Sequence, residues 1–354
     1  MKITHFISSP ASGGAEVYVK DLSIAMSKLG HQVHILFLST ADEIGRDISY
    51  EAKFLADLTD NSVEYSFIGN KARKNPLLGI KNLRKHIKHF EPAVLHCHLY
   101  YALVFSLFSL GVKVVYTHHN IKLKLPSIFY KIFDLRVSNY IGICHACTDM
   151  VSAITNKGVV NINNAVAENR LKTKKKYIDN CVPEILMVGH LSEQKNYKLI
   201  LEVVKLIKNK SFVVKIAGEG PEFRSFSTTV SESGLDSKIK LLGNVSNVSD
   251  YMYEADIFAM TSSWEGLPIS LIEATLTGLP TIVTNVGGCA EVAHETLNGF
   301  VVDSFEASVY AEKLSSLIDS FELRKNLSRN SLLYSGKFKL SAAVNSHLTL
   351  YTSI

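Results

Sequence analysis

Cysteine is scarce in this chain of 354 residues, which contains five, at positions 97, 144, 147, 181 and 289. An odd and scattered set does not suit a framework of disulfides, and it is typical of a reducing cytoplasm. One pair, Cys144 and Cys147, has the CxxC spacing of redox and zinc sites. Because the chain contains no second CxxC, we expect this pair to be structural and not a metal or redox site.

Long apolar segments are also missing. The first residues, MKITHFISSPASGG, include an apolar stretch too short for the core of a signal peptide, so we expect no secretion. The longest run without charge, residues 92–112, contains a proline and two histidines, and we interpret it as a buried strand followed by a buried helix. Low-complexity tracts and short repeats are absent, and the hydrophobic fraction of 47% is typical of a globular domain.

Short apolar runs alternate with amphipathic helical stretches, such as residues 15–29 and 76–90, along the whole chain. Strands buried on both faces and joined by helices indicate parallel sheets, and the length suits two domains. We predict strands at 2–8, 31–38, 93–99, 112–118 and 139–144 in the first half and at 184–189, 212–218, 239–243, 257–262, 281–285 and 299–303 in the second.

A stretch rich in charged residues marks the expected boundary between the two domains. The polar stretch from Glu168 to Lys176 indicates a linker. We therefore predict an α/β protein with two doubly wound domains that face each other across a cleft, because ligands bind outside the carboxyl ends of such sheets. The expected segments are an N-terminal, acceptor-side domain at 1–168, a linker at 169–183, a C-terminal, donor-binding domain at 184–335 and a helix at 336–354 that crosses back to the first domain.

The formal net charge of +5 is concentrated in the first half of the chain, and especially in residues 70–90. There Leu77, Leu83 and other apolar residues alternate with lysine and arginine, as in a basic helix that lies on an anionic membrane. A solvated helix packed on its sheet fits the pattern equally well. Few aromatic residues and no recognised reading motif accompany it, so we expect no nucleic-acid partner.

The stretch SSWEGLPISLIEATLTGLP, residues 262–280, carries the strongest functional signal. Pro268 suits the first turn of a helix that ends at Gly278, which leaves Glu265 in the loop before the helix and Glu273 one to two turns inside it. Backbone N–H groups and the helix dipole favour a phosphate there, whereas the carboxylates suit neutral hydroxyls. A ligand that carries hydroxyl groups on both sides of a diphosphate is a nucleotide sugar, so the phosphate site and the two carboxylates together indicate a nucleotide-sugar site. The alternative is two solvated glutamates.

Further polar motifs follow other predicted strands, and each is weak alone. Glycines at 13 and 14 and at 218 and 220 suit tight turns or close approach of a ligand, and Lys195 could neutralise a phosphate. Four histidines would come together at one sheet edge, where zinc is an alternative without a carboxylate ligand at a suitable spacing. They are His96, His98, His118 and His119.

Together these motifs resemble those of the retaining glycosyltransferase family 4, whose members have the GT-B arrangement of two Rossmann-like domains. The resemblance covers nearly the whole chain, and its most specific part is the pair Glu265 and Glu273. It extends over GGAE at 13–16, THHN at 117–120, INNAV at 162–166, VGHLSEQKN at 188–196, AGEGP at 217–221, SSWEGLPISLIEA at 262–274, GLP at 278–280 and VGG with Glu291.

The resemblance implies roles for individual residues. Glu273 would bind the ribose hydroxyls of the donor nucleotide, Glu265 the donor sugar and Lys195 the diphosphate. His119 would lie close to the reacting sugar, so that His119, Glu265 and Lys195 form the catalytic set. The other donor-binding positions implied are Gly14, His190, Gly218, Gly266, Leu267, Pro268 and Ile269.

The sequence departs from the family pattern at three positions. His190 stands where an arginine beside the diphosphate is common, so a permanent charge is replaced by an imidazole that is charged only when protonated. Lys195 would then carry more of the electrostatic load. Ala165 replaces a usual glycine and Cys144 a usual serine, and neither touches the inferred chemistry.

As a family member, the protein is expected to be a hexosyltransferase that retains the anomeric configuration. Because no DxD-like acidic cluster is present, we expect neither a metal nor a cofactor. The expected donor is a UDP-sugar in preference to a GDP-sugar. The expected acceptor is a saccharide linked to polyprenyl diphosphate, used for O-antigen, capsule or exopolysaccharide at the inner face of the cytoplasmic membrane. The alternatives are a sugar-nucleotide epimerase of the same fold and a binding or membrane scaffold protein without catalysis.

Overall fold

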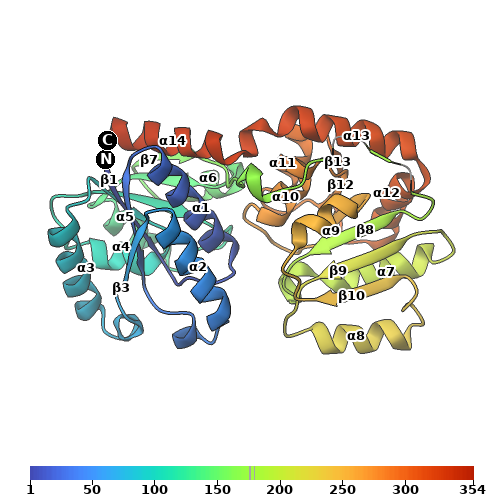
Figure 1. Cartoon of the computed structure of the whole chain (residues 1–354), viewed down its shortest axis with the longest axis horizontal. Coiled ribbons are helices and arrows are strands. Elements are labelled where there is room, and N and C mark those ends of the chain that lie inside the picture. Colours follow the sequence, from blue (N-terminus) through green and yellow to red (C-terminus); the bar gives the residue numbers. More distant parts are fainter. Residues whose placement is uncertain (175–176, 179) are drawn as a thin grey trace. The chain divides into compact units, whose positions relative to one another are not determined.

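The computed structural model describes residues 1–174, 177–178 and 180–354. These residues form two compact units, one made of Met1–Ala165 with Leu340–Ile354 and the other of Val166–Lys339. Each unit is built on one parallel sheet covered by helices, as Figure 1 shows. The predicted fold class of two doubly wound α/β units is therefore confirmed.

The first unit contains a seven-stranded sheet in the order β3-β2-β1-β4-β5-β6-β7. From β1 the chain builds outward to β3 and then returns to place β4 on the other side of β1, so β1 and β4 flank the point where the strand order reverses. The strands are β1 Lys2–Ile7, β2 Gln32–Phe37, β3 Glu64–Phe67, β4 Val94–Cys97, β5 Lys113–His118, β6 Val137–Gly142 and β7 Gly158–Asn161.

Helices cover both faces of this sheet. Apolar side chains of α3, α4 and α5 pack with Phe6, Leu95 and Tyr116 on one face. On the other face α14 packs against α1 (Figure 1). The Tyr351 hydroxyl of α14 bonds to His96 of β4. The helices are α1 Gly14–Lys28, α2 Ile48–Asp60, α3 Pro76–Phe90, α4 Tyr100–Ser106, α5 Ser127–Phe133, α6 His145–Ser152 and α14 Leu340–Ser353.

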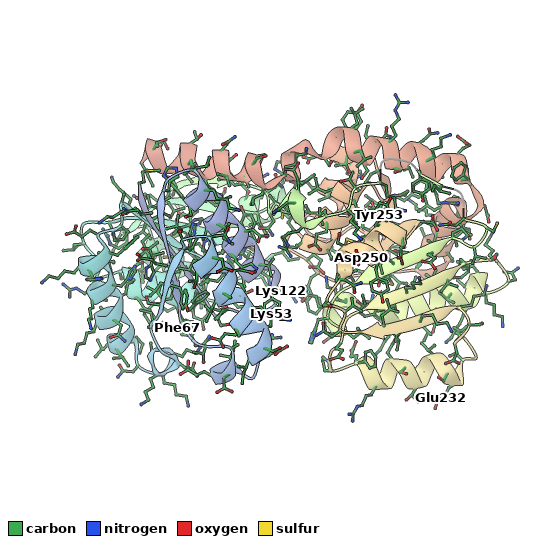
Figure 2. All side chains as sticks on the ribbon, in the orientation of Figure 1. Lys53, Phe67, Lys122, Glu232, Asp250 and Tyr253 are labelled. Atoms are coloured by element: carbon green, nitrogen blue, oxygen red, sulfur yellow. The ribbon has the colours of Figure 1, made fainter. Side chains whose placement is uncertain are left out.

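Sequence patterning missed two strands, β3 and β7, both at the edges of this sheet. Each has four residues, and none of the eight residues is buried. Phe67, labelled in Figure 2, is partly exposed and stacks on Phe37 with ring centroids 5.4 Å apart. A short edge strand has one neighbour and partial burial, so it lacks the continuous apolar run by which a central strand is recognised.

The second unit contains a six-stranded parallel sheet in the order β10-β9-β8-β11-β12-β13. Here β8 and β11 flank the reversal of strand order, as β1 and β4 do in the first unit. The strands are β8 Glu184–Val188, β9 Val213–Ala217, β10 Ile239–Gly243, β11 Ile257–Met260, β12 Thr281–Thr284 and β13 Gly299–Val302. Each lies within a run predicted to be a strand.

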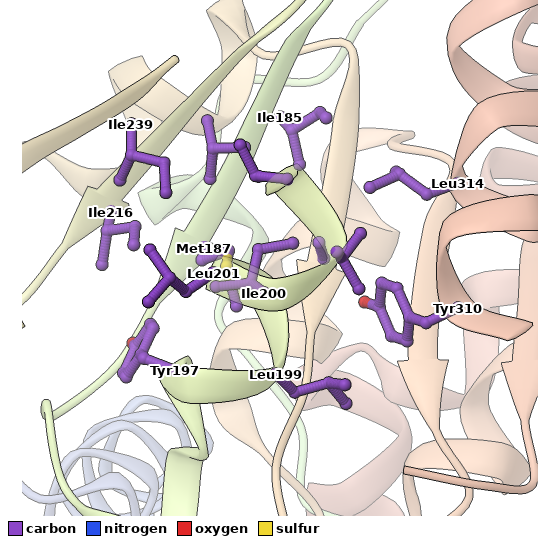
Figure 3. Close-up of a cluster of buried hydrophobic side chains, with 14 of the residues drawn as sticks. Ile185, Met187, Tyr197, Leu199, Ile200, Leu201, Ile216, Ile239, Tyr310 and Leu314 are labelled. Atoms are coloured by element: carbon purple, nitrogen blue, oxygen red, sulfur yellow. The ribbon is translucent and has the colours of Figure 1, made fainter. Parts of the chain in front are cut away.

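The core of the second unit lies between its sheet and helices α7 and α12. Figure 3 shows Ile185 and Met187 of β8 facing Ile200 of α7 and Tyr310 of α12, all of them buried. Tyr310 also donates a hydrogen bond to Ile282 O at 3.0 Å, which satisfies its buried hydroxyl. The helices are α7 Tyr197–Ile207, α8 Phe223–Glu232, α9 Val248–Glu254, α10 Ile269–Thr277, α11 Cys289–Thr296, α12 Ala307–Asp319 and α13 Phe321–Tyr334.

The described part of 169–183, expected to be a linker, is bound to the second unit. Lys172 Nζ lies 2.6 Å from Asp250 Oδ1, and Lys174 N donates to Thr277 O at 2.9 Å. Lys172, one of the charges that indicated a solvated connection, therefore pairs with α9, while Lys175 and Lys176 lie outside the described residues. The chain enters the first unit again at Leu340, where α14 begins.

The segment 92–112 forms the expected buried strand and helix, β4 and α4. No helix in the described ranges has the length and apolarity needed to cross a membrane.

Candidate functional site

The carboxyl ends of β8 and β11 hold the predicted donor site. These neighbouring strands flank the reversal of strand order, where the connections leave in opposite directions and open a space for a ligand. Lys195 lies in the loop after β8, at the end of a short 3₁₀ turn, and Glu265 lies in the loop after β11. The fold thus brings together two residues that are 70 positions apart in the sequence.

Lys195 and Glu265 form a largely buried ion pair. Lys195 Nζ lies 2.7 Å from Glu265 Oε1, and the two side chains are 16% and 8% exposed. Ser262 Oγ donates to the same oxygen at 2.9 Å, and Gln194 Nε2 donates to Oε2 at 3.3 Å. Glu265 is therefore fixed by one cation and two neutral donors. The pair also places a lysine charge where an incoming anion can share it.

Two glycines allow backbone segments near this ion pair to pass very close to each other. Gly287 has φ +50°, and a Cβ there would lie 1.9 Å from the carbonyl oxygen of Glu265. Gly218 has φ +144°, and a Cβ there would lie 2.0 Å from Gly189 O. The loops after β8, β9, β11 and β12 are therefore packed backbone against backbone, which larger residues would prevent.

Helix α10 supplies the helix start that the sequence predicts. Pro268 is the residue just before the first turn, with φ −68° and ψ 126°, instead of the first helical residue. The helix ends at Gly278, whose φ of 94° is the left-handed conformation expected of a terminating glycine. Glu273 is the fifth helical residue, so it lies one turn inside, as predicted.

Glu273 lines a hollow of about 570 Å³ in the second unit. Arg170 and Lys172 also line it, together with Asn247 and Asp250 from the region after β10, and Asp250 is labelled in Figure 2. The volume lies in the range of small-molecule pockets. Sequence reasoning missed these four residues, although two of them belong to the charged stretch that was taken for a linker.

The first unit separates the four predicted histidines. Side chains of a strand alternate between faces, so His96, His98 and His119 lie on the α14 side of the sheet and His118 on the opposite side. His98 Nδ1 lies 3.0 Å from His119 Nε2, whereas His118 Nδ1 lies 3.2 Å from the Tyr116 hydroxyl. Burial lowers the pKa of His119 to about 3 and that of His118 to about 4, so both are neutral at pH 7.

A fifth histidine, His5 of β1, joins this group and was missed because a lone histidine in an apolar strand carries no functional signal. Ring nitrogens of His5, His96 and His98 come within 4.8 Å of one another. Both nitrogens of His96, however, already bond to hydroxyls, Nε2 to Thr117 at 2.7 Å and Nδ1 to Tyr351 at 2.6 Å. The cluster is thus a hydrogen-bonded network, and the geometry does not favour the zinc alternative.

The other predicted donor-site residues and the CxxC pair lie outside the ion pair and the histidine group. Gly14 is the first residue of α1 and His190 is exposed after β8. Gly266 O accepts a hydrogen bond from Gly288 N at 2.7 Å, and Leu267 is buried. Cys144 and Cys147 are both buried at the start of α6.

Comparisons with known proteins agree with the two parallel-sheet units. Residues 12–164 match the model of Glycosyltransferase Family 4, and residues 169–332 match that of Glycosyl transferases group 1. The structure of HepE from Anabaena in complex with UDP superposes with a TM-score of 0.84 at 17% identity, covering 100% of both chains. The two family models together match nearly the whole chain, which therefore belongs to the glycosyltransferase family 4 type, and its two Rossmann-like units have the GT-B fold.

Relatives within this family include enzymes of bacterial polysaccharide synthesis. The amylovoran biosynthesis glycosyltransferase AmsD of Erwinia amylovora is 32% identical over 146 residues, 41% of each chain. The O-antigen biosynthesis glycosyltransferase WbnH of Escherichia coli is 29% identical over 217 residues, 60% of this chain and 58% of WbnH. The N,N'-diacetylbacillosaminyl-diphospho-undecaprenol alpha-1,3-N-acetylgalactosaminyltransferase of Campylobacter jejuni is 26% identical over 49% of this chain and 45% of the relative. The matched part therefore spans less than two thirds of each of these relatives.

Proposed function

We propose that this glycosyltransferase binds a UDP-sugar at the carboxyl ends of β8 and β11 and transfers the sugar, with retention, to a lipid-linked saccharide. The observation that carries the proposal is the Lys195–Glu265 pair in front of α10, with Glu273 at the adjoining hollow. The complex of HepE with UDP, which has the same fold, supports the choice of UDP as donor nucleotide.

Each charged group has a task that its chemistry suits. The Glu273 carboxylate accepts hydrogen bonds from the ribose hydroxyls, and the hollow that it lines receives the nucleoside. The Lys195 ammonium group also interacts with the diphosphate, and Glu265 then accepts a hydrogen bond from a hydroxyl of the donor sugar. As the anomeric C–O bond breaks, charge grows on the diphosphate, where Lys195 and the N-terminus of α10 stabilise it.

The remaining roles follow from the family resemblance. His119 acts at the reacting sugar, Gly14 lets the backbone approach the leaving phosphate, and His190 takes the place of an arginine beside the diphosphate. The positive groups that this scheme requires belong to the protein itself, so the transfer is proposed to need neither metal nor cofactor.

A thermal-shift experiment tests the donor site before any acceptor is known. UDP, GDP, ADP and their common sugars are added to the purified protein, because a ligand that binds the folded state raises the melting temperature. We expect UDP and one or more UDP-sugars to raise it, Glu273→Ala to abolish the shift and Glu232→Ala, a matched change at an exposed position of α8, to preserve it. No shift with any nucleotide at millimolar concentration would refute the proposal.

A lipid-linked acceptor requires the enzyme to reach a membrane, and the first unit offers a surface for this. Helix α3 buries Gly79 and Leu83, while Lys81, Arg84, Lys85 and Lys88 are exposed. The segment 127–135 exposes large apolar side chains, namely Ile128 at 58%, Phe129 at 42%, Ile132 at 43% and Leu135 at 79%. Basic and apolar groups of this kind suit an anionic bilayer surface. The name of the Campylobacter jejuni relative includes a diphospho-undecaprenol, which supports a lipid-linked acceptor.

Flotation with phosphatidylglycerol vesicles tests the membrane proposal. We expect the protein to float with the vesicles and the four-fold variant Lys81→Gln, Arg84→Gln, Lys85→Gln, Lys88→Gln to remain in solution. The matched control neutralises four exposed charges of the second unit, Lys198, Lys208, Arg224 and Lys240, and should float as the parent does. Equal recovery of the α3 variant and the parent would exclude this surface.

A further inference from the structure

The loops after β8 and β11 contain a single permanent positive charge. Residues 189–196 and 261–268 together include one lysine, Lys195, and no arginine. This lysine already has a charged partner, because its ammonium group lies 2.7 Å from Glu265 Oε1. A diphosphate that binds in front of α10 therefore meets a cation that a carboxylate of the protein already holds.

Glu265 depends on Lys195 for its charge balance. The other hydrogen bonds to its carboxylate come from neutral donors, Ser262 Oγ at 2.9 Å and Gln194 Nε2 at 3.3 Å. The same Gln194 amide also donates to Trp264 O at 3.0 Å. Neutral donors form weaker bonds to a carboxylate than a cation does. Because the Glu265 side chain is only 8% exposed, losing Lys195 would leave a nearly buried carboxylate without a cation, which is costly.

A nucleoside diphosphate without a sugar can interact with this lysine in two ways, and Glu265 opposes both. If Lys195 keeps its bond to Glu265 and also contacts the diphosphate, two anions lie beside one ammonium group and repel each other. If Lys195 turns fully to the diphosphate, the Glu265 carboxylate loses its cation. Glu265 therefore lowers the affinity for a free diphosphate in either arrangement.

A nucleotide sugar differs from the free diphosphate in two respects that matter to Glu265. Its terminal phosphate is esterified, so it lacks the second ionisation, with a pKa of about 6, that adds charge to a free terminal phosphate. Its sugar also brings hydroxyl groups, which can donate hydrogen bonds to an ionised carboxylate that can only accept them. The nucleotide sugar therefore repels Glu265 less and offers it new donors.

We propose that Glu265 competes with the diphosphate for Lys195 and thereby makes the donor site prefer the nucleotide sugar over the free nucleoside diphosphate. The class of ligand rests on the proposed function. After transfer, the diphosphate that remains has no sugar hydroxyl for Glu265, so the return of Lys195 to Glu265 favours release of this product. Glu265 is thus a specificity-determining residue that distinguishes the substrate from the product of the same site.

Calorimetric titration of the whole protein tests this competition, with UDP and with the UDP-sugar that gives the largest shift in the thermal screen. We expect the parent to bind the UDP-sugar more tightly than UDP. Glu265→Gln should bind UDP about 10-fold more tightly than the parent does, because its amide carries no charge that holds Lys195. Unchanged or weaker UDP binding by this variant would overturn the inference and leave the donor site intact. No UDP binding by any variant would refute the proposed function as well.

Two further variants show whether the gain in affinity comes from Lys195. The double variant Lys195→Met, Glu265→Gln has no lysine to release, so it should bind UDP more weakly than Glu265→Gln does, and equal affinities would contradict the competition. Glu202→Gln removes a carboxylate of α7 that pairs with Lys205 at 2.8 Å in an exposed position, and it should bind UDP as the parent does. If Glu265→Gln does not fold, the parent decides, since UDP binding as tight as that of the UDP-sugar would also overturn the inference.

Discussion

Lys195 Nζ and Glu265 Oε1 lie 2.7 Å apart, and both side chains are largely buried at the carboxyl edge of the second sheet. A buried ion pair of this kind is costly to break on one side, because the remaining charge keeps no partner. A ligand that brings a diphosphate and sugar hydroxyls offers new partners to both groups at once. Lys195 and Glu265 therefore have partners in both states. They pair with each other when no donor is bound, and with groups of the donor when it is present.

The first prediction concerns this pair and stability. Lys195→Met should lower the free energy of unfolding of the second unit by about 2–4 kcal/mol, because it leaves the Glu265 carboxylate buried without a cation. The double variant Lys195→Met, Glu265→Gln should recover most of that loss. Denaturant unfolding of the parent, the two single variants and the double variant measures the coupling, and additive losses would show that the two residues do not interact.

The second prediction separates donor binding from transfer. Glu265→Gln keeps the shape of the side chain and removes its charge, so we expect UDP binding to persist and sugar transfer to fall by about 10²-fold or more. The measurement is UDP release from the donor found in the thermal screen, combined with calorimetric titration of UDP. Full transfer activity in this variant would exclude a direct role of Glu265.

The third prediction tests the close backbone contact at Gly218. Gly218→Ala should destabilise the second unit by about 1–3 kcal/mol and weaken UDP binding, because its Cβ would lie 2.0 Å from Gly189 O. Gly336→Ala is a suitable control, since a Cβ there would meet nothing within 4 Å among the described residues. Melting temperatures with and without UDP compare the two variants, and equal effects would argue against close packing of the loops.

The fourth prediction concerns the loss of stability at acidic pH. Burial lowers the pKa of His347 from 6.5 to about 3, so between these values the unfolded chain binds a proton that the folded chain excludes. Its contribution to stability is therefore complete above pH 6.5 and is lost as the pH falls toward 3. In His347→Phe the fall in unfolding free energy with acid should be shallower by up to about 1.4 kcal/mol per pH unit. Denaturant unfolding from pH 7 to 5 measures this, and parallel profiles would contradict it.

Local sequence was sufficient to predict all strands of the second sheet, the five inner strands of the first sheet and the helix before Gly278. Periodicity and turn residues act over a few neighbouring positions, so strands such as β8 and the limits of α10 could be read directly. The family resemblance, in turn, followed from short motifs that each lie within one loop. The edge strands β3 and β7 could not be found in this way, because their burial depends on neighbours distant in the chain.

Tertiary structure alone decided which distant residues meet. The sequence proposed Lys195 for a phosphate and Glu265 for a sugar, but their ion pair exists only because β8 and β11 are adjacent in the sheet. The histidines give the same lesson, since strand alternation divides His118 from His119 and brings the unpredicted His5 to His98. Chemical type and local geometry are properties of the sequence, whereas partners and burial depend on contacts that form only when distant strands and helices pack together.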